Sequence, residues 1–231
     1  MNAIILCGGL STRLGEITKE MPKIMLPVGG KPILDWQLEK LQTVNVQEVV
    51  LAAGHLAHVL YHQAGTERLG MELTYAIEDK KLGTGGAIKH AMSYLKDPNE
   101  PFFVLNGDVL YTIDFADMRT RLKPESEGII LAQQVHDASA YGTLEFDEKD
   151  LRLKSFKEKE GIAKPAFING GLYLFTAKVK EHFSGQDAFS IEYDVFPHMK
   201  DLYVYPSESP WVDVGVPERL EWVRINWRSF L

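Results

Sequence analysis

The sequence predicts a three-layer α/β fold with a mixed, mostly parallel sheet, and two patterns carry this prediction. In the first half of the chain, short apolar runs alternate with segments whose apolar residues have helical spacing. In the second half, apolar runs follow one another without such helices. Alternating strands and helices build a parallel sheet covered on both faces, whereas strands joined by short loops pair in antiparallel fashion.

The elements of the first half are justified by apolar pattern and by turn residues. Ala3–Cys7 is an apolar run that ends at glycine, which indicates a buried strand. Lys31–Val44 places Leu34, Leu38 and Leu41 at helical spacing behind a proline suited to a first turn. The other expected elements are a strand at Gln47–Ala53, a short helix from about His55, a strand at Glu72–Ile77, a helix at Thr84–Leu95 and a strand at Phe102–Leu105.

The second half is expected to be more antiparallel and to close on a helix. Its predicted strands are Ile129–Gln133, Gly142–Phe146, Leu151–Phe156 and Gly171–Phe175, and a helix is expected from Pro217. No linker, repeat or low-complexity tract divides the chain. We therefore expect a single domain over residues 1–231, with a nucleotide-binding half at 1–125 and a second half at 126–231.

Charge and cysteine content exclude several classes of protein. The net charge of −7 argues against a nucleic-acid partner, which normally meets a basic face. A single cysteine, Cys7, cannot form an internal disulfide, which is typical of a reducing compartment and predicts a cytoplasmic location. No run approaches the ~20 apolar residues of a membrane span, so no membrane partner is expected.

The loop after the first strand has the residues of a phosphate site. Gly8 and Gly9 follow the strand at the end where open α/β sheets bind ligands, and glycine lets backbone N–H groups approach phosphate. Arg13 and Lys23 add a guanidinium fork and a point charge. GxGxxG is absent, and Pro32 breaks the GxxxxGK[ST] pattern, so neither common nucleotide motif applies. Taken alone, the loop could also be a plain glycine-rich turn.

Seven segments together resemble the sugar-1-phosphate nucleotidyltransferase family, in the family's order. They are "GGLSTRLGEITKEMPKIMLPVGGKP", "EDKKLGTGGAI", "LNGD", "YGTLEFD", "SFKEK", "NGGLYLF" and "VDVGVPE". Within the family, the chain is most similar to the short D-glycero-D-manno-heptose 1-phosphate guanylyltransferases. Ser11 and Ile24 depart from the pattern, because the family more often has glycine and proline there.

The resemblance implies a Rossmann-like, GT-A-like nucleotidyltransferase fold and a reaction that activates sugars for cell-surface polysaccharides. A sugar 1-phosphate attacks the α-phosphorus of a nucleoside triphosphate with Mg²⁺ as cofactor, and GTP and a heptose 1-phosphate are the implied substrates. A phosphate monoester has a second pKa near ~6, so the nucleophile is already ionised at neutral pH. No general base is needed, and the seven histidines require no catalytic role.

The resemblance also assigns site residues, position by position. The catalytic pair is Arg13 and Lys23, and the implied metal ligands are Asp108 and Asp213. The nucleotide is expected at Leu6, Gly8, Gly9, Ser11, Thr12, Glu78, Gly83 and Thr84, with Gly85 also letting the backbone approach. The sugar phosphate is expected at Asn106, Gly142, Glu158, Lys159 and Asn169. Without the family, the two aspartates could equally be a turn residue and a helix cap.

In the family, a residue shortly before the "LGTGG" segment reads the edge of the base, and the resemblance implies that Glu78 has this role and favours guanine. An ionised carboxylate only accepts hydrogen bonds, and guanine offers two adjacent donors, its ring N–H and its exocyclic amine. Uracil and thymine present one N–H between two carbonyls, which would repel a carboxylate. A site that pairs substrate donors discriminates strongly against analogues that lack them. Glu78 could otherwise be a surface acid beside Asp79.

Other functions remain open at this stage. A related enzyme could use UTP or dTTP with a hexose 1-phosphate, and a catalytically silent homologue could bind nucleotide sugars and regulate a partner. A glycosyltransferase of similar architecture usually carries Asp-x-Asp, whereas Asn106-Gly107-Asp108 has one carboxylate. Aromatic residues near the end of the chain, Trp222, Trp227 and Phe230, could form a homodimer face or cover the core.

Overall fold

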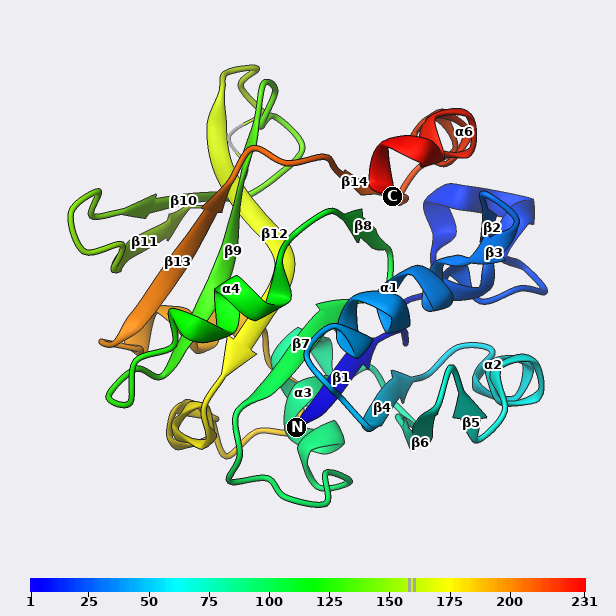
Figure 1. Cartoon of the computed structure of the whole chain (residues 1–231), viewed down its shortest axis with the longest axis horizontal. Helices are drawn as coiled ribbons and strands as arrows, with labels where there is room; N and C mark the ends of the chain where they lie inside the picture. Colours follow the sequence, from blue (N-terminus) through cyan, green and yellow to red (C-terminus); the bar gives the residue numbers. More distant parts are fainter. Residues whose placement is uncertain (158, 160) are drawn as a thin grey trace.

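The computed structural model describes residues 1–157, 159 and 161–231 and is organised around one ten-stranded sheet (Figure 1). Its centre consists of the parallel strands β7 (Phe102–Asn106), β1 (Asn2–Leu6), β4 (Glu48–Ala53) and β6 (Met71–Ile77), in that spatial order. The two-residue strand β5 (Glu67–Arg68) pairs antiparallel with β6 and closes this edge. The parallel centre matches the prediction made from alternating strands and helices.

The second half extends the same sheet through β12 (Ala166–Phe175), which pairs antiparallel with β7. On its far side β12 pairs with β9 (Gly128–Val135) and β10 (Thr143–Phe146). Beyond them, β13 (Leu202–Ser207) pairs with β9, and β11 (Leu153–Lys157) pairs with β10. The pairing of β12 with β9 shifts register between Asn169 and Tyr173. That irregularity lies beside the residues of β12 that pair with β7, which begin at Leu172.

Two short antiparallel strand pairs lie outside the main sheet. In one pair, β2 (Pro27–Val28) is antiparallel to β3 (Lys31–Pro32). In the other, β8 (Val109–Tyr111) follows β7 directly and pairs with β14 (Trp211–Asp213). This second pair brings a late segment of the chain to the carboxyl end of a central strand, as Figure 1 shows between the two halves.

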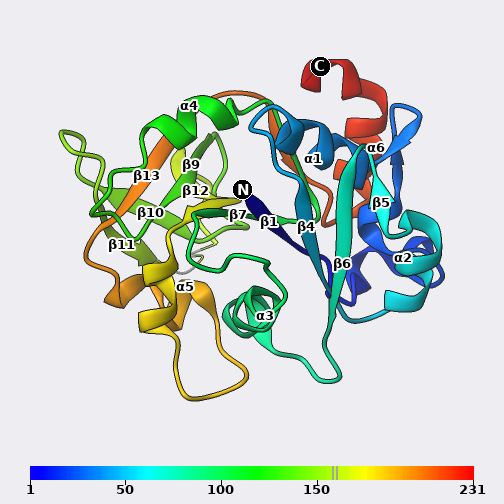
Figure 2. The same ribbon diagram turned by 60° about the horizontal axis from the view of Figure 1, so that its bottom comes forward.

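Helices cover both faces of the sheet, which gives the three layers (Figure 2). Ala3 and Ile5 of β1 face one apolar cluster, and Ile4 between them faces the other. The first face carries α1 (Ile33–Gln42), α2 (Ala57–Ala64), α4 (Phe115–Thr120) and α6 (Pro217–Asn226). The second carries α3 (Gly83–Met92) and α5 (Ile191–Asp194). Short 3-10 helices occupy Thr12–Thr18, Lys23–Met25, Ala177–His182, Phe196–His198 and Trp227–Phe230.

The strands expected from the sequence are all present, with small shifts at their ends. The strand expected at Leu151–Phe156 is Leu153–Lys157, and the helix expected at Lys31–Val44 is Ile33–Gln42. The elements that the sequence did not predict are the strands β2, β3, β5, β8, β13 and β14, the helices α4 and α5, and the 3-10 helices. All are short or, in β13, interrupted by Pro206, so they give little periodic signal.

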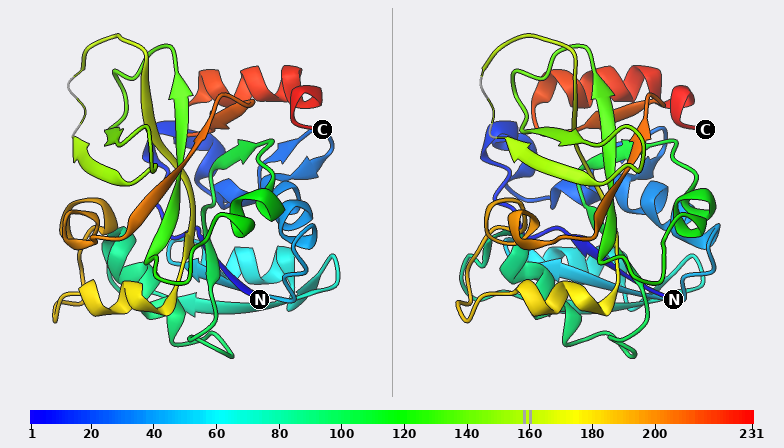
Figure 3. Two further views of the ribbon diagram at one scale, coloured as in Figure 1. Left: turned by 60° about the vertical axis from the view of Figure 1, so that its left-hand side comes forward. Right: turned by 90° about the vertical axis from the view of Figure 1, so that its left-hand side faces the viewer.

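The aromatic residues near the end of the chain mostly cover the core. Phe230 is buried, and the ring of Trp227 lies 6.2 Å from that of Trp36. Trp222 is 49% exposed. Figure 3 shows the C-terminal helix α6 in red beside the blue segment that contains β2, and there Arg224 Nε donates to the carbonyl of Pro27 at 3.2 Å. The homodimer stays a prediction.

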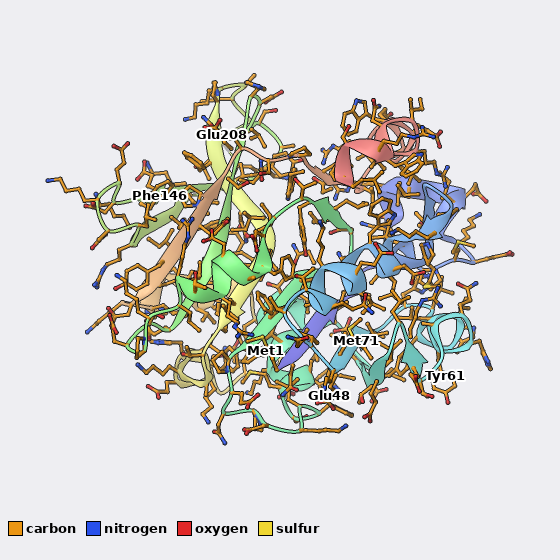
Figure 4. The ribbon with its side chains drawn as sticks, in the orientation of Figure 1. Met1, Glu48, Tyr61, Met71, Phe146 and Glu208 are labelled. Carbon is orange, nitrogen blue, oxygen red and sulfur yellow. The ribbon has the colours of Figure 1, made fainter. Side chains whose placement is uncertain are left out.

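The two ends of the parallel strands carry different segments of the chain. Figure 4 labels Met1, Glu48 and Met71, which lie together where β1, β4 and β6 begin. The glycine-rich loop after β1 lies at the opposite, carboxyl ends of these strands.

Among the residues described, none of the helices has the length and apolar character needed to cross a bilayer.

Candidate active site

A cavity of about 590 Å³ lies at the carboxyl ends of the central strands. Its lining includes every residue expected to bind the nucleotide: Leu6, Gly8, Gly9, Ser11, Thr12, Glu78, Gly83 and Thr84. Arg13 and Lys23 also line it. Residues that lie far apart in the sequence therefore meet at one concave surface large enough for a nucleotide.

The loop after β1 enters the cavity through a strained turn. Ser11 has φ +52°, in the left-handed region that favours glycine, and it precedes the 3-10 helix Thr12–Thr18. Thr18 Oγ1 donates to the carbonyl of Ser11 at 3.1 Å, which holds the turn. Burial, with the nearby Glu78 charge, raises the pKa of the Cys7 thiol to about 12. Cys7 therefore stays protonated at neutral pH and is no nucleophile.

Glu78 lies against the backbone of two glycines. A Cβ added at Gly8 or at Gly54 would come within 2.7 Å of Glu78 Oε1, so both positions leave room for this carboxylate. The backbone N–H of Leu82 donates to Glu78 Oε2 at 3.3 Å. Burial raises the pKa of the Glu78 carboxyl above its usual range. A half-buried acceptor on the cavity wall is what the base-reading role requires.

The start of α3 faces a neighbouring segment as well as the cavity. A Cβ at Gly83, whose φ is +71°, would lie 2.6 Å from the carbonyl oxygen of Phe189, and one at Gly85 would meet the Phe189 ring at 2.4 Å. Thr84 Oγ1 donates to Glu192 Oε2 at 2.6 Å. The missing side chains at residues 83 and 85 thus make room for Phe189, and Gly85 is not part of the cavity wall described above.

Two smaller cavities, of about 330 Å³ and about 210 Å³, lie in the second half and share Asn106 and Asn169. Gly142 and Lys159 line the larger of them. Asn169 is held by two hydrogen bonds, as donor to Tyr173 Oη at 2.8 Å and as acceptor from the N–H of Gly171 at 3.1 Å. Four of the five residues expected at the sugar phosphate therefore gather here. Glu158 lies outside the described residues.

The two aspartates implied as metal ligands are neighbours in space. Asp213 of β14 pairs with Val109 of β8, and the N–H of Val214 donates to the carbonyl of Asp108 at 2.8 Å. Lys23 Nζ lies 2.8 Å from Asp108 Oδ2. Pairing of β8 with β14 thus brings both carboxylates to one wall of the 210 Å³ cavity.

Asp213 is engaged by two side chains that the sequence did not single out. Arg219 Nη1 donates to Asp213 Oδ2, and the Tyr141 hydroxyl donates to the same oxygen. Burial and the Asp213 carboxylate raise the pKa of Tyr141. Both residues stand inside or next to quoted motifs, "YGTLEFD" and "VDVGVPE". Arg219 directly follows the second motif, and no local pattern marks it as a partner of Asp213.

The donor set at the two aspartates fits magnesium. In the described part of the chain, no group of three or more His, Cys, Asp or Glu residues could hold a metal ion. Magnesium commonly takes one or two carboxylates and completes its octahedron with water and substrate phosphates. Asp108 and Asp213 match that pattern, and no all-protein cage would be needed.

Arg13 lies where the 590 Å³ cavity, which we call the nucleotide cavity, meets the 210 Å³ cavity. It lines both the 590 Å³ and the 210 Å³ cavities. A Cβ at Gly215 would lie 3.0 Å from Arg13 Nη2, and the N–H of Gly215 donates to Asp213 Oδ1 at 2.9 Å. The junction therefore holds Arg13 and Lys23 together with both aspartates, and it can accommodate phosphates that arrive from either side.

Comparison with known proteins agrees with this geometry. The family described as "Nucleotidyl transferase" matches residues 2–224. The D-glycero-alpha-D-manno-heptose 1-phosphate guanylyltransferase of Campylobacter jejuni is 40% identical over 220 residues, which cover 94% of this chain and 96% of that protein. The mannose-1-phosphate guanylyltransferase catalytic subunit beta of Danio rerio is 34% identical over 94% of this chain, which spans 62% of that longer protein.

Solved structures show the same fold. The crystal structure of HddC from Yersinia pseudotuberculosis complexed with GMP-PN has a TM-score of 0.84 and 30% identity, over 98% of this chain and 99% of that one. A structure described as a glucose-1-phosphate thymidylyltransferase from Bacillus anthracis has a TM-score of 0.82 at 24% identity, over 99% of this chain and 95% of that one. Sequence, fold and site agree, and the chain belongs to the nucleotidyl transferase family.

Proposed function

We propose that this protein transfers GMP from GTP to D-glycero-D-manno-heptose 1-phosphate, giving a GDP-heptose and pyrophosphate. The observation that carries the proposal is the continuity of the site. Glu78 lies on the wall of the nucleotide cavity, and Arg13 connects that cavity to the one lined by Asn106 and Asn169. The relative from Campylobacter jejuni, which the chain matches along almost its whole length, supports the choice of substrates.

The chemistry is a displacement at phosphorus. An oxygen of the sugar phosphate attacks the α-phosphorus of GTP, a new P–O bond forms, and the bond to the β-phosphate breaks to release pyrophosphate. The attacking oxygen is already ionised, so the protein has to align two anions and stabilise the charge that develops. No base or covalent nucleophile is required, consistent with the protonated Cys7 thiol.

Four side chains at the junction divide this work. Arg13 would bind the triphosphate with a guanidinium fork, and Lys23 would lie between the two phosphate groups as a point charge. Asp108 and Asp213 would hold magnesium, which supplies positive charge to the phosphate oxygens when bound. Lys23 keeps Asp108 neutralised in the protein alone, because their atoms are 2.8 Å apart.

Glu78 would select the base. Its half-buried carboxylate accepts one backbone hydrogen bond, from Leu82, and an ionised carboxylate can accept further bonds from the two donors of guanine. A pair of hydrogen bonds to a buried charged group distinguishes bases by about 10²-fold or more.

A cytoplasmic location is part of the proposal, because an unpaired cysteine is typical of a reducing compartment.

The decisive experiment measures pyrophosphate release with magnesium across four nucleoside triphosphates and several sugar 1-phosphates, including D-glycero-D-manno-heptose and mannose. Release with GTP and the heptose phosphate is expected. Release with UTP or dTTP instead would retain the reaction and reject the guanine assignment. Absence of release with every pair would reject the enzymatic function.

Two variants separate the base-reading role from general effects of charge. Glu78→Gln should lower GTP selectivity about 10²-fold while nucleotide binding persists. Asp79→Asn is the matched control, because it removes a charge from the neighbouring residue, which is not among those that line the nucleotide cavity. Equal selectivity in the wild type and in Glu78→Gln would reject Glu78 as the base reader.

A further inference from the structure

Arg219 and Asp213 form an ion pair at the site where the proposed function needs magnesium. Arg219 is in the first turn of α6, and its Nη1 donates both to Asp213 Oδ2 and to the Tyr141 hydroxyl. The side chains of Arg219 and Asp213 are only 28% and 14% exposed, so water screens their attraction incompletely. This pair neutralises Asp213 before any metal arrives.

The remaining donors of Arg219 are available for a ligand. Across the described residues, the hydrogen bonds of this guanidinium all come from Nη1, which leaves Nε and Nη2 without a protein acceptor. Arg219 lines the 210 Å³ cavity together with Asn106 and Asn169, and it does not line the larger nucleotide cavity. Any anion it binds would therefore lie on the sugar-phosphate side.

A metal bound at Asp213 would compete with this guanidinium for the carboxylate charge. A sugar phosphate brings about −1.5 to −2 charges into the small cavity. One carboxylate oxygen cannot accept a full ion pair and coordinate magnesium with equal strength. When Asp213 engages the metal, Arg219 loses part of its attraction to that carboxylate, and the nearest new anion is the arriving phosphate. Arginine suits this exchange, because its planar fork matches phosphate oxygens in pairs.

We propose that Arg219 is an exchangeable partner: it pairs with Asp213 in the free protein and binds the phosphate of the sugar 1-phosphate when Asp213 holds magnesium. This inference rests on the proposed function. It adds a substrate-binding residue in α6, outside the quoted motifs. It also explains why Arg219 neutralises the Asp213 carboxylate before a metal ion binds there.

The test uses Mn²⁺ as a magnetic probe of the metal site, together with the kinetics of pyrophosphate release. In Arg219→Gln, Asp213 has lost a competing cation, so Mn²⁺ should bind the protein alone about threefold more tightly. The KM for the sugar 1-phosphate should rise about tenfold or more, whereas the KM for GTP should change less than about twofold.

Two further variants keep the result interpretable. Arg219→Lys retains a charge without the fork, so its Mn²⁺ affinity should stay near that of the wild type while the KM for the sugar phosphate rises about threefold. Arg224→Gln, on the same helix but bound to Glu221 and the carbonyl of Pro27, should match the wild type in all measurements.

The outcomes distinguish this inference from the proposed function. Unchanged or weaker Mn²⁺ binding in Arg219→Gln would overturn the exchange, and so would an equal rise in the KM of both substrates. If the wild type released no pyrophosphate with any substrate pair, the proposed function would fail. The Mn²⁺ titration alone would then decide whether Arg219 competes for Asp213.

Discussion

The side-chain amide of Gln37, on α1, donates a hydrogen bond of 2.8 Å to the backbone carbonyl of Asn106. The same nitrogen donates to the carbonyl of Val109 at 2.9 Å. These two carbonyls stand on either side of Asp108, so one buried side chain holds the turn that presents a proposed metal ligand. Gln37 is 1% exposed, and its location on a neighbouring helix makes it a positioning residue.

Replacement of Gln37 by leucine should therefore affect both stability and metal binding. The free energy of unfolding should fall by about 2–4 kcal/mol, because two backbone carbonyls lose their shared donor at a buried site. Mn²⁺ affinity should fall as the turn around Asp108 loosens. Urea unfolding and Mn²⁺ titration measure the two effects.

The exposed residue Gln42, near the end of the same helix, provides the control for this substitution. Gln42→Leu should change the free energy of unfolding by less than about 0.5 kcal/mol. A Gln37→Leu variant with normal Mn²⁺ affinity would show that the turn keeps its shape without the amide.

Glu78 should make stability depend on pH. Burial raises the pKa of its carboxyl in the folded state above the unfolded value. Its contribution to stability is then fully present below the unfolded pKa and is lost as pH rises through the folded pKa. Glu78→Gln cannot ionise, so its stability relative to the wild type should increase as pH rises from the unfolded pKa of this carboxyl through its folded pKa.

Urea unfolding at several pH values measures this difference in free energy. The same series on Asp79→Asn controls for removing a charge from the loop. A difference between Glu78→Gln and the wild type that stays constant with pH would contradict the raised pKa.

Gly54 does not line the nucleotide cavity, yet Gly54→Ala should weaken the recognition of guanine. The added methyl group would lie 2.7 Å from Glu78 Oε1 and 3.1 Å from the carbonyl oxygen of Gly8, so the carboxylate has to move. The KM for GTP should rise about tenfold, equivalent to the loss of roughly one charge-assisted hydrogen bond. Steady-state kinetics with GTP measures this effect.

A double variant tests whether the effect passes through Glu78. In a Glu78→Gln background, Gly54→Ala should add little, because contacting residues are not additive. Gly185→Ala is the control, since an added Cβ there meets nothing within 4 Å. Fully additive effects would show that Gly54 acts on the nucleotide by another route.

Ser11→Gly should stabilise the protein. Ser11 has φ +52°, a conformation that costs an L-residue roughly 1–2 kcal/mol and glycine very little. After the extra chain entropy of glycine, we expect a gain of about 0.5–1 kcal/mol in thermal or urea unfolding. Ser93→Gly, at φ −69°, should show a loss of similar size, and a gain at both positions would contradict the explanation by strain.

The sequence predicted the strands of the parallel centre well, because buried apolar runs such as Phe102–Leu105 have one clear interpretation. It also predicted which residues line the nucleotide cavity, since Gly8, Arg13 and Glu78 stand in recognisable motifs. The roles of these residues remain proposals. The order of the strands, with β1 between β7 and β4, followed from no local pattern.

Residues that act through distant contacts were not predictable. Gln37 has the appearance of an ordinary helix residue, and its function depends on carbonyls about 70 positions away. Arg219 follows a motif whose neighbours give no indication of a partner at residue 141. Gly85 was expected to let the backbone approach a nucleotide, yet it does not line the cavity, and the space beside it is filled by Phe189.

The pairing of β8 with β14 has a consequence for the growing polypeptide on the ribosome. The nucleotide cavity is built mainly from early segments, whereas Asp213 and Arg219 emerge only after nearly all the other strands have been made. A nascent or clipped molecule that ends before β14 would keep most of the nucleotide wall and lack one of the two junction carboxylates. Because the proposed metal site needs both carboxylates, a molecule that ends before residue 213 should show no turnover.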